Sequence, residues 1–463
     1  MRGRSWGSAV GAATLLVVFP GVGAEAAVPN PGETLRVSVD VDDGDPDGHS
    51  GGPSISGDGR YVAFVSDASD LTPGDANGEK DVFVRDLVAG TTTRVSVDAD
   101  GGDPNGFSRE ATISADGRHV AFTSGASDLV AGDGNGEFDV FVRDLVAGTT
   151  TRASVDLLGG DSDWDSNTDS LSGDGRYVAF TSIATDLVVG DGNAAPDVFV
   201  RDLLLGTTVR ASVDRHGGDA VFGGHAGSLS ADGRRVAFGS ASWDLVPDDR
   251  NNEIDVFVRD LVGGTTVRAS VNRQGGSPND DSGDAQMSAD GRSVAFSSRA
   301  DNLVPDDTDD PFFQRDDVFV RDLVAGTTEL ASVNIEGDQR NGDSDEPSIS
   351  GDGRYVAFAS GASDLVPGDG NEKDDVFVRG LGPPRPVVSI GDAAVYEGDS
   401  KTRPARFTVS LSKPSAASVT VSYETVHGTT SADDIIGKTG SLTLTAGQTS
   451  RTISIPVSGD TDA

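Results

Sequence analysis

One short string constrains what this chain can fold into. Asp-Val-Phe-Val-Arg occurs six times, beginning at Asp81, Asp139, Asp197, Asp255, Asp317 and Asp375. The spacings are 58, 58, 58, 62 and 58 residues. An Asp-Gly-Arg triplet precedes each copy, and a run related to Arg-Val-Ser-Val-Asp follows five of them. Self-similarity at a fixed period is typical of repeat architectures, so the sequence is read as six copies of one unit.

Each unit predicts four strands and no helix. In the first unit the strands are expected at residues 53–56, 60–66, 81–87 and 92–98, where Val, Phe, Tyr and Thr alternate with polar residues. Gly and Asp punctuate the gaps, which favours tight hairpins. Four antiparallel strands repeated radially form a β-propeller blade, so the fold class is all-β with six blades. A solenoid is the alternative, but it needs no matched ends.

The two ends of the repeat match each other. Residues 36–40 read Arg-Val-Ser-Val-Asp, which is a copy of the outer strand without its own unit. The last unit runs to residue 381 and then continues into Gly-Pro-Pro in place of an outer strand. The number of outer strands equals the number of blades if residues 35–40 complete the last blade. Such closure would remove both exposed strand edges. We therefore expect a propeller closed by its N-terminal strand.

The repeat resembles the TolB-type, WD-like propeller repeats of bacteria. The resemblance rests on the pattern Ser-x-Asp-Gly-Arg-x-Val-Ala-Phe-x-Ser, followed by Asp-Val-Phe-Val-Arg-Asp, and it covers residues 34–381. Gly57 and Ala115 stand where the family pattern has Pro. The resemblance implies the propeller fold. It implies little about function, because these propellers serve complexes, surface binding and enzymes alike.

A second module is expected after Pro383, Pro384 and Pro386. Strands are predicted at residues 387–390, 405–411, 418–424, 440–444 and 449–457. Residues 386–463 resemble a Calx-β domain, an immunoglobulin-like sandwich, through Val-Tyr-Glu-Gly-Asp at 395–399, Phe-Thr-Val at 407–409 and Ile-Pro-Val-Ser-Gly-Asp at 455–460. The resemblance implies an all-β sandwich that is incomplete, because the sequence stops before the family's final strand.

Calcium is the cofactor that this resemblance implies. The family's ligands fall on Glu397, Asp434 and Asp460, although Ile435 replaces the usual aromatic residue. Within the propeller, oxygen-bearing residues at alternate positions also resemble the start of a calcium loop. Those residues are Asp75, Asn77, Glu79 and Asp81, then Asp133, Asn135, Glu137 and Asp139, with Asp249, Asn251, Glu253 and Asp255 in the fourth unit. Plain Asx-turns explain the same loop residues and stay open as the alternative.

Composition excludes several classes of partner and site. The chain has 36 Lys+Arg against 75 Asp+Glu, a formal charge of −39, which argues against nucleic acid. It has no cysteine, which excludes disulfides and thiolate metal sites. Residues 1–26 read as a secretory signal, with Arg2 and Arg4 before a short apolar core and a small-residue site at 24–26. We expect a secreted or cell-surface protein with no membrane span.

No motif predicts catalysis. The Gly-His-Ser-Gly-Gly string at 48–52 matches a hydrolase elbow, but no helix is expected after it. The Asp58/Arg60 and Arg85/Asp86 pairs recur in almost every unit, whereas an active site is needed once. Their repetition favours a structural role. We therefore expect a protein that is not an enzyme.

The face with long loops, such as residues 67–80 and 99–109, is the expected binding surface. The residues that break the repeat there are Trp164, Phe222, His225, Trp243, Phe312 and Phe313. Aromatic rings on acidic loops suit stacking against a glycan or anchoring of an extracellular protein. The alternative is that each ring forms a small core beneath its own loop. Two other functions stay open: an extracellular enzyme acting on glycans, and a support protein of an envelope complex.

Overall fold

The computed structural model describes residues 35–305, 315–337, 340–367, 369, 373–381, 388–390, 403–411, 419–425 and 439–457. Every regular element in these ranges is a β-strand. No helix in them is long and apolar enough to cross a membrane. The chain divides into two compact units, the six-bladed propeller and a C-terminal unit at Pro383–Ala463.

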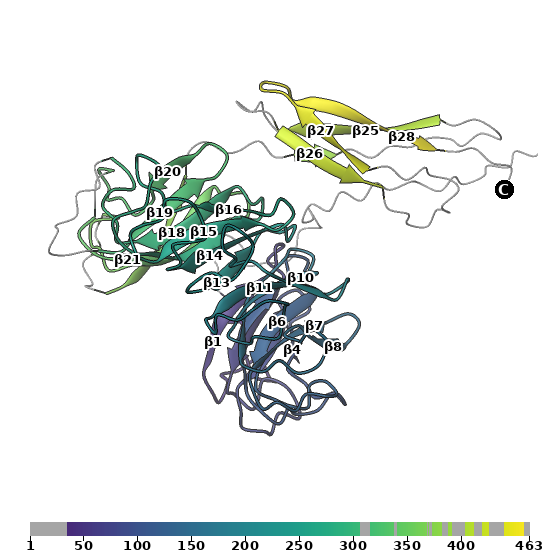
Figure 1. The fold of residues 1–463 in the computed structure, drawn as a ribbon. Helices are drawn as coiled ribbons and strands as arrows, with labels where there is room; N and C mark the ends of the chain where they lie inside the picture. Colours follow the sequence, from purple (N-terminus) through teal and green to yellow (C-terminus); the bar gives the residue numbers. More distant parts are fainter. Residues whose placement is uncertain are drawn as a thin grey trace, which may run out of the picture. The chain divides into compact units, whose positions relative to one another are not determined.

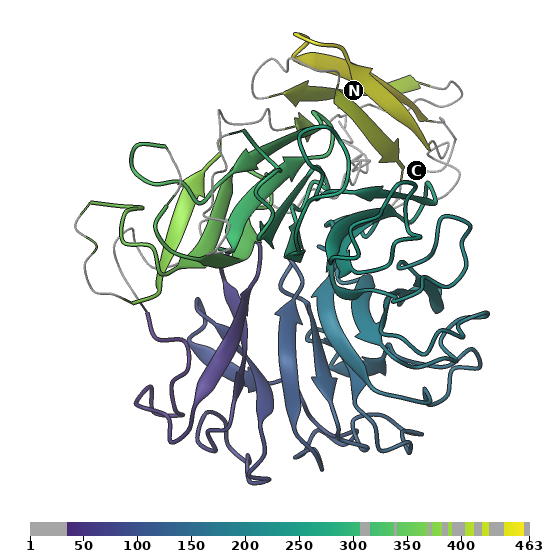
Figure 2. The same ribbon diagram turned by 60° about the vertical axis from the view of Figure 1, so that its left-hand side comes forward.

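Blades one to five are antiparallel sheets of four strands each, drawn in sequence from purple to green in Figures 1 and 2. Blade one contains β1 (Ser50–Ile55), β2 (Tyr61–Ser66), β3 (Asp81–Asp86) and β4 (Thr91–Arg94). Blade two contains β5 (Ser108–Ile113), β6 (His119–Ser124), β7 (Asp139–Asp144) and β8 (Thr149–Arg152). Blade three contains β9 (Ser166–Leu171), β10 (Tyr177–Ser182), β11 (Asp197–Asp202) and β12 (Thr207–Arg210).

The later blades follow the same plan. Blade four contains β13 (His225–Leu229), β14 (Arg235–Ser240), β15 (Asp255–Asp260) and β16 (Thr265–Arg268). Blade five contains β17 (Ser282–Met287), β18 (Ser293–Ser298), β19 (Asp317–Asp322) and β20 (Thr327–Leu330). Blade six contains β21 (Ser344–Ile349), β22 (Tyr355–Ser360) and β23 (Asp375–Gly380). The six-bladed all-β prediction is confirmed.

The alternating apolar residues of the repeat pack blade against blade. In β2 and β3, Phe64 lies opposite Phe83, and the two rings stack with centroids 5.9 Å apart. Val82 and Val84 of blade one share an apolar cluster with Ile113, Val120 and Phe122 of blade two. The same contacts recur at the following junctions, so each blade buries the face of its predecessor. Burial of apolar surface at these junctions is the main stabilisation of the propeller.

The ring is open between blades six and one, which corrects the prediction that residues 35–40 close it. Among the described residues, blade six is a sheet of three strands, and residues 35–40 form no strand with β23. Val376 and Val378 of β23 are therefore 79% and 68% exposed, whereas Val82 and Val84 are 0% and 4% exposed. The N-terminal segment lies on blade one, where Val37 packs against the Phe64–Phe83 cluster.

The C-terminal unit has strands at all five of the predicted ranges. β24 (Val388–Ile390), β25 (Arg403–Leu411) and β28 (Ser450–Val457) form one sheet, and β26 (Val419–Glu424) pairs with β27 (Thr439–Leu444). Phe407, Ile453 and Leu444 belong to one apolar cluster that draws on both sheets. Glu397, Asp434 and Asp460, the predicted calcium ligands, lie outside the described residues.

Candidate binding site at the centre of the propeller

The loops predicted to bind calcium hold buried arginines. In blades one to four, the arginine that ends the outer strand lies among aspartates of the same blade and of the following loop. We call each group an arginine socket. The sockets are Arg94 with Asp75, Asp81 and Asp103; Arg152 with Asp133, Asp139 and Asp161; Arg210 with Asp191, Asp197 and Asp219; and Arg268 with Asp249 and Asp255.

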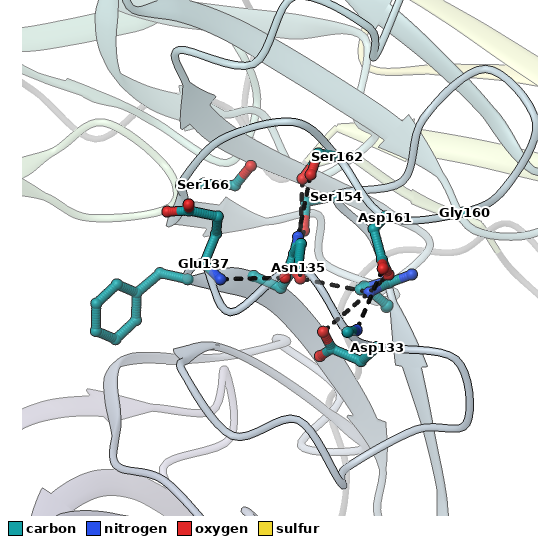
Figure 3. Close-up of polar contacts among 12 residues, drawn as sticks. Asp133, Asn135, Glu137, Ser154, Gly160, Asp161, Ser162 and Ser166 are labelled. Atoms are coloured by element: carbon teal, nitrogen blue, oxygen red, sulfur yellow. Dashed lines mark hydrogen bonds and ion pairs between the residues drawn. The ribbon is translucent and has the colours of Figure 1, made fainter.

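The socket of blade two shows the geometry (Figure 3). One guanidinium nitrogen of Arg152 lies 3.3 Å from Asp133, 3.4 Å from Asp139 and 2.6 Å from Asp161. Ser154 donates a further hydrogen bond of 2.5 Å to Asp139. Burial, together with repulsion from Asp139, raises the pKa of Asp133 to about 6. The positive charge that these carboxylates need is supplied by the protein itself.

The donor set of these loops does not fit calcium. Asp81 is fully buried, whereas Glu79 is exposed to solvent. The oxygen of the Asn77 side chain accepts from the backbone N–H of Glu79 at 2.9 Å, which is the Asx-turn left open as the alternative. Within the described ranges, no group of three or more His, Cys, Asp or Glu could hold a metal ion. The repeated carboxylates are explained by arginine.

Blade five also holds a buried arginine, but this arginine comes from a different position in the sequence. Leu330 stands where the outer-strand arginine is expected, and Ser332 donates a hydrogen bond of 2.6 Å to the buried Asp317. Arg340, from the following loop, supplies a fully buried guanidinium that contacts Asp317 and donates to Ser344 at 2.8 Å. Sequence reasoning missed Arg340. The signal for it was the loss of arginine at residue 330 alongside an arginine gained ten residues later.

The residues that differ from blade to blade lie at the centre of the propeller. Neighbouring inner strands contact one another from β1 to β21 and so surround the central channel. Each inner strand carries a β-bulge near its start. In five blades the bulge holds a residue in the left-handed region: Gly52 (φ 59), Glu110 (φ 56), Ala226 (φ 57), Asp284 (φ 50) and Glu346 (φ 48). Bulges and non-glycine residues with such backbone angles concentrate at functional sites.

Each bulge carboxylate of blades two, three and five has a hydroxyl partner on the next strand. Thr123 donates to Glu110 at 2.9 Å, Thr181 to Asp169 at 2.8 Å and Ser297 to Asp284 at 2.7 Å. The same position of the second strand is Val65 in blade one and Ala359 in blade six. In blade four it is Gly239, and a Cβ there would lie 2.9 Å from the His225 ring. The second strand therefore varies together with the channel residue that it supports.

A cavity of about 280 Å³ opens among these residues in blades four to six. His225, Asp284, Arg299, Asp316 and Asp345 line it. Arg299 and Asp316 form an ion pair of 3.2 Å. Burial lowers the pKa of His225, which favours the neutral ring. Burial and the charges of Glu346, Asp316 and Asp284 raise the pKa of Asp345. The cavity thus offers carboxylates, an imidazole and a guanidinium to a polar ligand.

The other side of the channel is also polar. Arg109 donates to the side chain of Asn167 in the next blade at 2.7 Å, and its guanidinium lies 4.6 Å from the centre of the Phe138 ring. Asp169 is half-buried, and desolvation of its carboxyl raises its pKa to about 7. The channel lining is therefore polar on both sides.

The predicted aromatic residues lie on the long loops of blades three and four. Trp164, Phe222 and Trp243 are 52%, 58% and 46% exposed. These fractions do not fit rings that are enclosed in cores beneath their loops. Of the predicted site residues that the structure describes, His225 lines the cavity. Phe312 and Phe313 lie outside the described residues. Because each inner strand begins at the long-loop face, the aromatic rings and the channel bulges share one end of the propeller.

No family model and no curated protein matches this chain. Solved propellers are similar in fold. TolB from Acinetobacter baumannii is 18% identical, with 65% of this chain aligned to 57% of that chain at a TM-score of 0.36. A putative TolB from Agrobacterium tumefaciens is 16% identical, with 73% and 91% covered at a TM-score of 0.38. The β-propeller domain of the Trilobed protease from Pyrococcus furiosus is 11% identical, with 78% and 91% covered at 0.43.

Proposed function

We propose that this chain is a non-catalytic, secreted or cell-surface binding protein that holds an extracellular glycan at the long-loop end of its channel. One observation carries the proposal: the blades share their sockets and packing but differ at the channel bulge. A structural role would use one residue type six times, whereas a single ligand needs a different group on each side.

The chemistry of this end suits a polyhydroxylated ligand. The exposed rings of Trp164, Phe222 and Trp243 offer flat apolar faces, which stack on sugar rings. Asp284 and Asp345 can accept hydrogen bonds from hydroxyl groups, and Arg299 can donate to ring or carboxylate oxygens. Few convergent polar groups in a concavity, with aromatic residues at its rim, are the usual composition of a small-ligand site.

One finer feature belongs to this proposal. The C-terminal unit is taken as a Calx-β-like sandwich, with calcium bound at Glu397, Asp434 and Asp460.

A glycan-binding screen followed by calorimetry tests the function. We expect Trp164→Ala with Phe222→Ala, and separately Asp284→Asn, to weaken binding at least tenfold while thermal unfolding stays unchanged. Val146→Ala is the matched control, because Val146 is an exposed residue of a tight turn on the opposite face. Equal binding by all variants would overturn the proposal.

The mixed set of groups in the cavity favours one alternative, an enzyme acting on the same glycan. Carboxylates in different electrostatic settings can divide the roles of acid and base in glycoside hydrolysis. Incubation of the bound glycan with the protein decides between the two. Release of shorter products, abolished by Asp345→Asn, would replace the binding function with hydrolysis.

A further inference from the structure

The cavity in blades four to six carries more negative charge than the protein neutralises. Among the described residues, one arginine, Arg299, lines it together with four aspartates: Asp281, Asp284, Asp316 and Asp345. His225 adds no charge at pH 7, because burial lowers the pKa of its ring. The described lining of the cavity is therefore strongly acidic.

The protein already uses two of these aspartates. Asp281 accepts a hydrogen bond of 2.8 Å from the backbone N–H of Ile254. Asp316 forms the ion pair with the cavity arginine. For Asp284 and Asp345, no lysine, arginine or histidine of the described ranges lies within ion-pair distance of the carboxylate. These two carboxylates are thus left without a cation from the described part of the chain.

Blade six gives its carboxylates no hydroxyl donor either. Ala359 lies opposite Asp345, at the position from which Thr or Ser donates to the bulge carboxylate in blades two, three and five. After burial, the causes that raise the pKa of Asp345 most are all carboxylates: Glu346, Asp316, Asp284 and Asp374. A cation that arrived here would relieve this repulsion.

The arginine sockets show how the chain treats gathered carboxylates elsewhere. Every socket of blades one to four surrounds a guanidinium from the outer strand, and in blade five Arg340 supplies one beside Asp317. Asp284 and Asp345 are brought to one cavity but receive no guanidinium. Because a hydrogen bond between two charged groups is stronger than one between neutral groups, the missing cation is one that a ligand can supply.

The cavity has room for a small cation beside these groups. Gly283, in β17, holds the position that His225 holds in β13 and Asp345 holds in β21. A Cβ at Gly283 would meet no atom within 4 Å beyond its chain neighbours, so the space there is open. A primary ammonium group has three N–H donors, and carboxylates and a neutral imidazole both accept hydrogen bonds. Among the described residues no group fits a metal ion, which favours an organic cation.

We infer that this cavity binds the ammonium group of its ligand through Asp284 and Asp345, so that the glycan carries an amino sugar whose nitrogen is not acetylated. The sugar part of this inference rests on the proposed function. The ammonium part rests on the charge of the cavity, on the two carboxylates without a cation and on the open space at Gly283.

An array tests the inference when it presents each amino sugar in its free and N-acetylated forms, beside neutral glycans, spermidine and a peptide with a free amino terminus. We expect the full chain to bind a free-amine form about tenfold or more tightly than its N-acetylated counterpart, because acetylation removes the charge. Calorimetry on that pair of glycans measures the difference. Asp345→Asn should remove most of the preference for the free amine.

Gly283→Lys supplies the missing cation from the protein itself. It should weaken binding of the free-amine glycan about tenfold or more without lowering the melting temperature, because the lysine pairs with carboxylates that lacked a cation. Gly51→Lys is the matched control, since Gly51 holds the same position in blade one, a Cβ there also meets open space, and Gly51 does not line the cavity. This control should bind the glycan as the original protein does. If Gly283→Lys does not fold, Asp345→Asn gives the decision.

Each outcome decides the inference. Equal binding of free and N-acetylated forms, or a preference for neutral glycans, would overturn the ammonium site while the proposed glycan function stands. Binding of spermidine or the peptide but of no glycan would overturn the amino sugar and the proposed function together, and so would binding of no probe. Equal weakening by Gly283→Lys and Gly51→Lys would indicate a general effect of charge and would remove Asp284 and Asp345 as the site.

Discussion

The arginine sockets and the channel bulges use charge in opposite ways. Sockets recur with the same residue types in blades one to four, and their arginine side chains are at most 8% exposed. At the channel bulges, the residue in the left-handed region is Gly in blade one, Glu in blades two and six, Ala in blade four and Asp in blade five. The neighbours of this residue differ from blade to blade. Charge that repeats serves the fold, and charge that varies around a shared axis is available for a ligand.

Blade five sharpens the comparison. When Leu330 removes the outer-strand arginine, Arg340 restores a buried guanidinium beside Asp317 from a different position. The charge is retained although its place in the sequence changes. At the channel, Ala226 stands at a bulge where blades two, five and six carry an acid. The two regions are therefore under different physical requirements, which substitution can measure.

The largest effect is expected in a socket. Arg152→Ala leaves Asp133 and Asp139 buried without their partner, so it should reduce the free energy of unfolding by about 3–5 kcal/mol. Arg118→Ala is the matched control, because its ion pair with Asp144 is half-exposed and should contribute much less to stability. Urea unfolding measures both. Similar losses in the two variants would remove the distinction between socket and surface charge.

The next effect concerns Asp169, a half-buried residue of the channel. Its pKa is raised by burial from 3.8 to about 7. The folded state therefore holds this proton more tightly than the unfolded state does. Its contribution to stability is complete below pH 3.8 and is lost as the pH rises to about 7. Asp169→Asn should reduce the fall in melting temperature between pH 3.8 and about 7. If the melting temperature of the variant depends on pH as that of the original protein does, the raised pKa of Asp169 is contradicted.

A smaller effect of opposite sign is expected in the cavity. Burial, followed by repulsion from Glu346, Asp316 and Asp284, raises the pKa of Asp345, so its surroundings destabilise the ionised form. Asp345→Asn should stabilise the protein slightly, by about 0.5 kcal/mol, because solvent screens this mostly exposed group. The same change should weaken ligand binding. A loss of stability as large as that of Arg152→Ala would indicate that Asp345 stabilises the fold instead of binding a ligand.

The smallest effect is expected from calcium on the propeller. Because the sockets contain their own cation, calcium should raise the propeller's melting temperature no more than sodium at equal ionic strength. Tryptophan fluorescence reports on this unit, since Trp164 and Trp243 lie in its third and fourth blades. A larger increase in melting temperature with calcium than with sodium would indicate that the propeller loops bind calcium.

Much of the fold could be predicted because it is periodic. Six copies of Asp-Val-Phe-Val-Arg determine which strands exist, and five strand ranges of the C-terminal unit follow from local alternation. The contact between Arg340 and Asp317 could not be predicted from the sequence, because Arg340 lies outside the spacing of the repeat. The pairing of Thr181 with Asp169 escaped notice because both residues look like ordinary strand positions. His225 was predicted on the long-loop face because it breaks the repeat, and its position at the cavity comes from the structure alone.

The repeated junction also makes the blades exchangeable units. Every blade presents the same apolar face to its neighbour, so a copy of blade two inserted in place of blade four would meet familiar partners on both sides. The channel lining and the long loops would change, with Glu110 and Thr123 arriving where Ala226 and Gly239 had been. Duplication of a blade followed by divergence at such positions would alter the channel lining while the packing between blades stays the same.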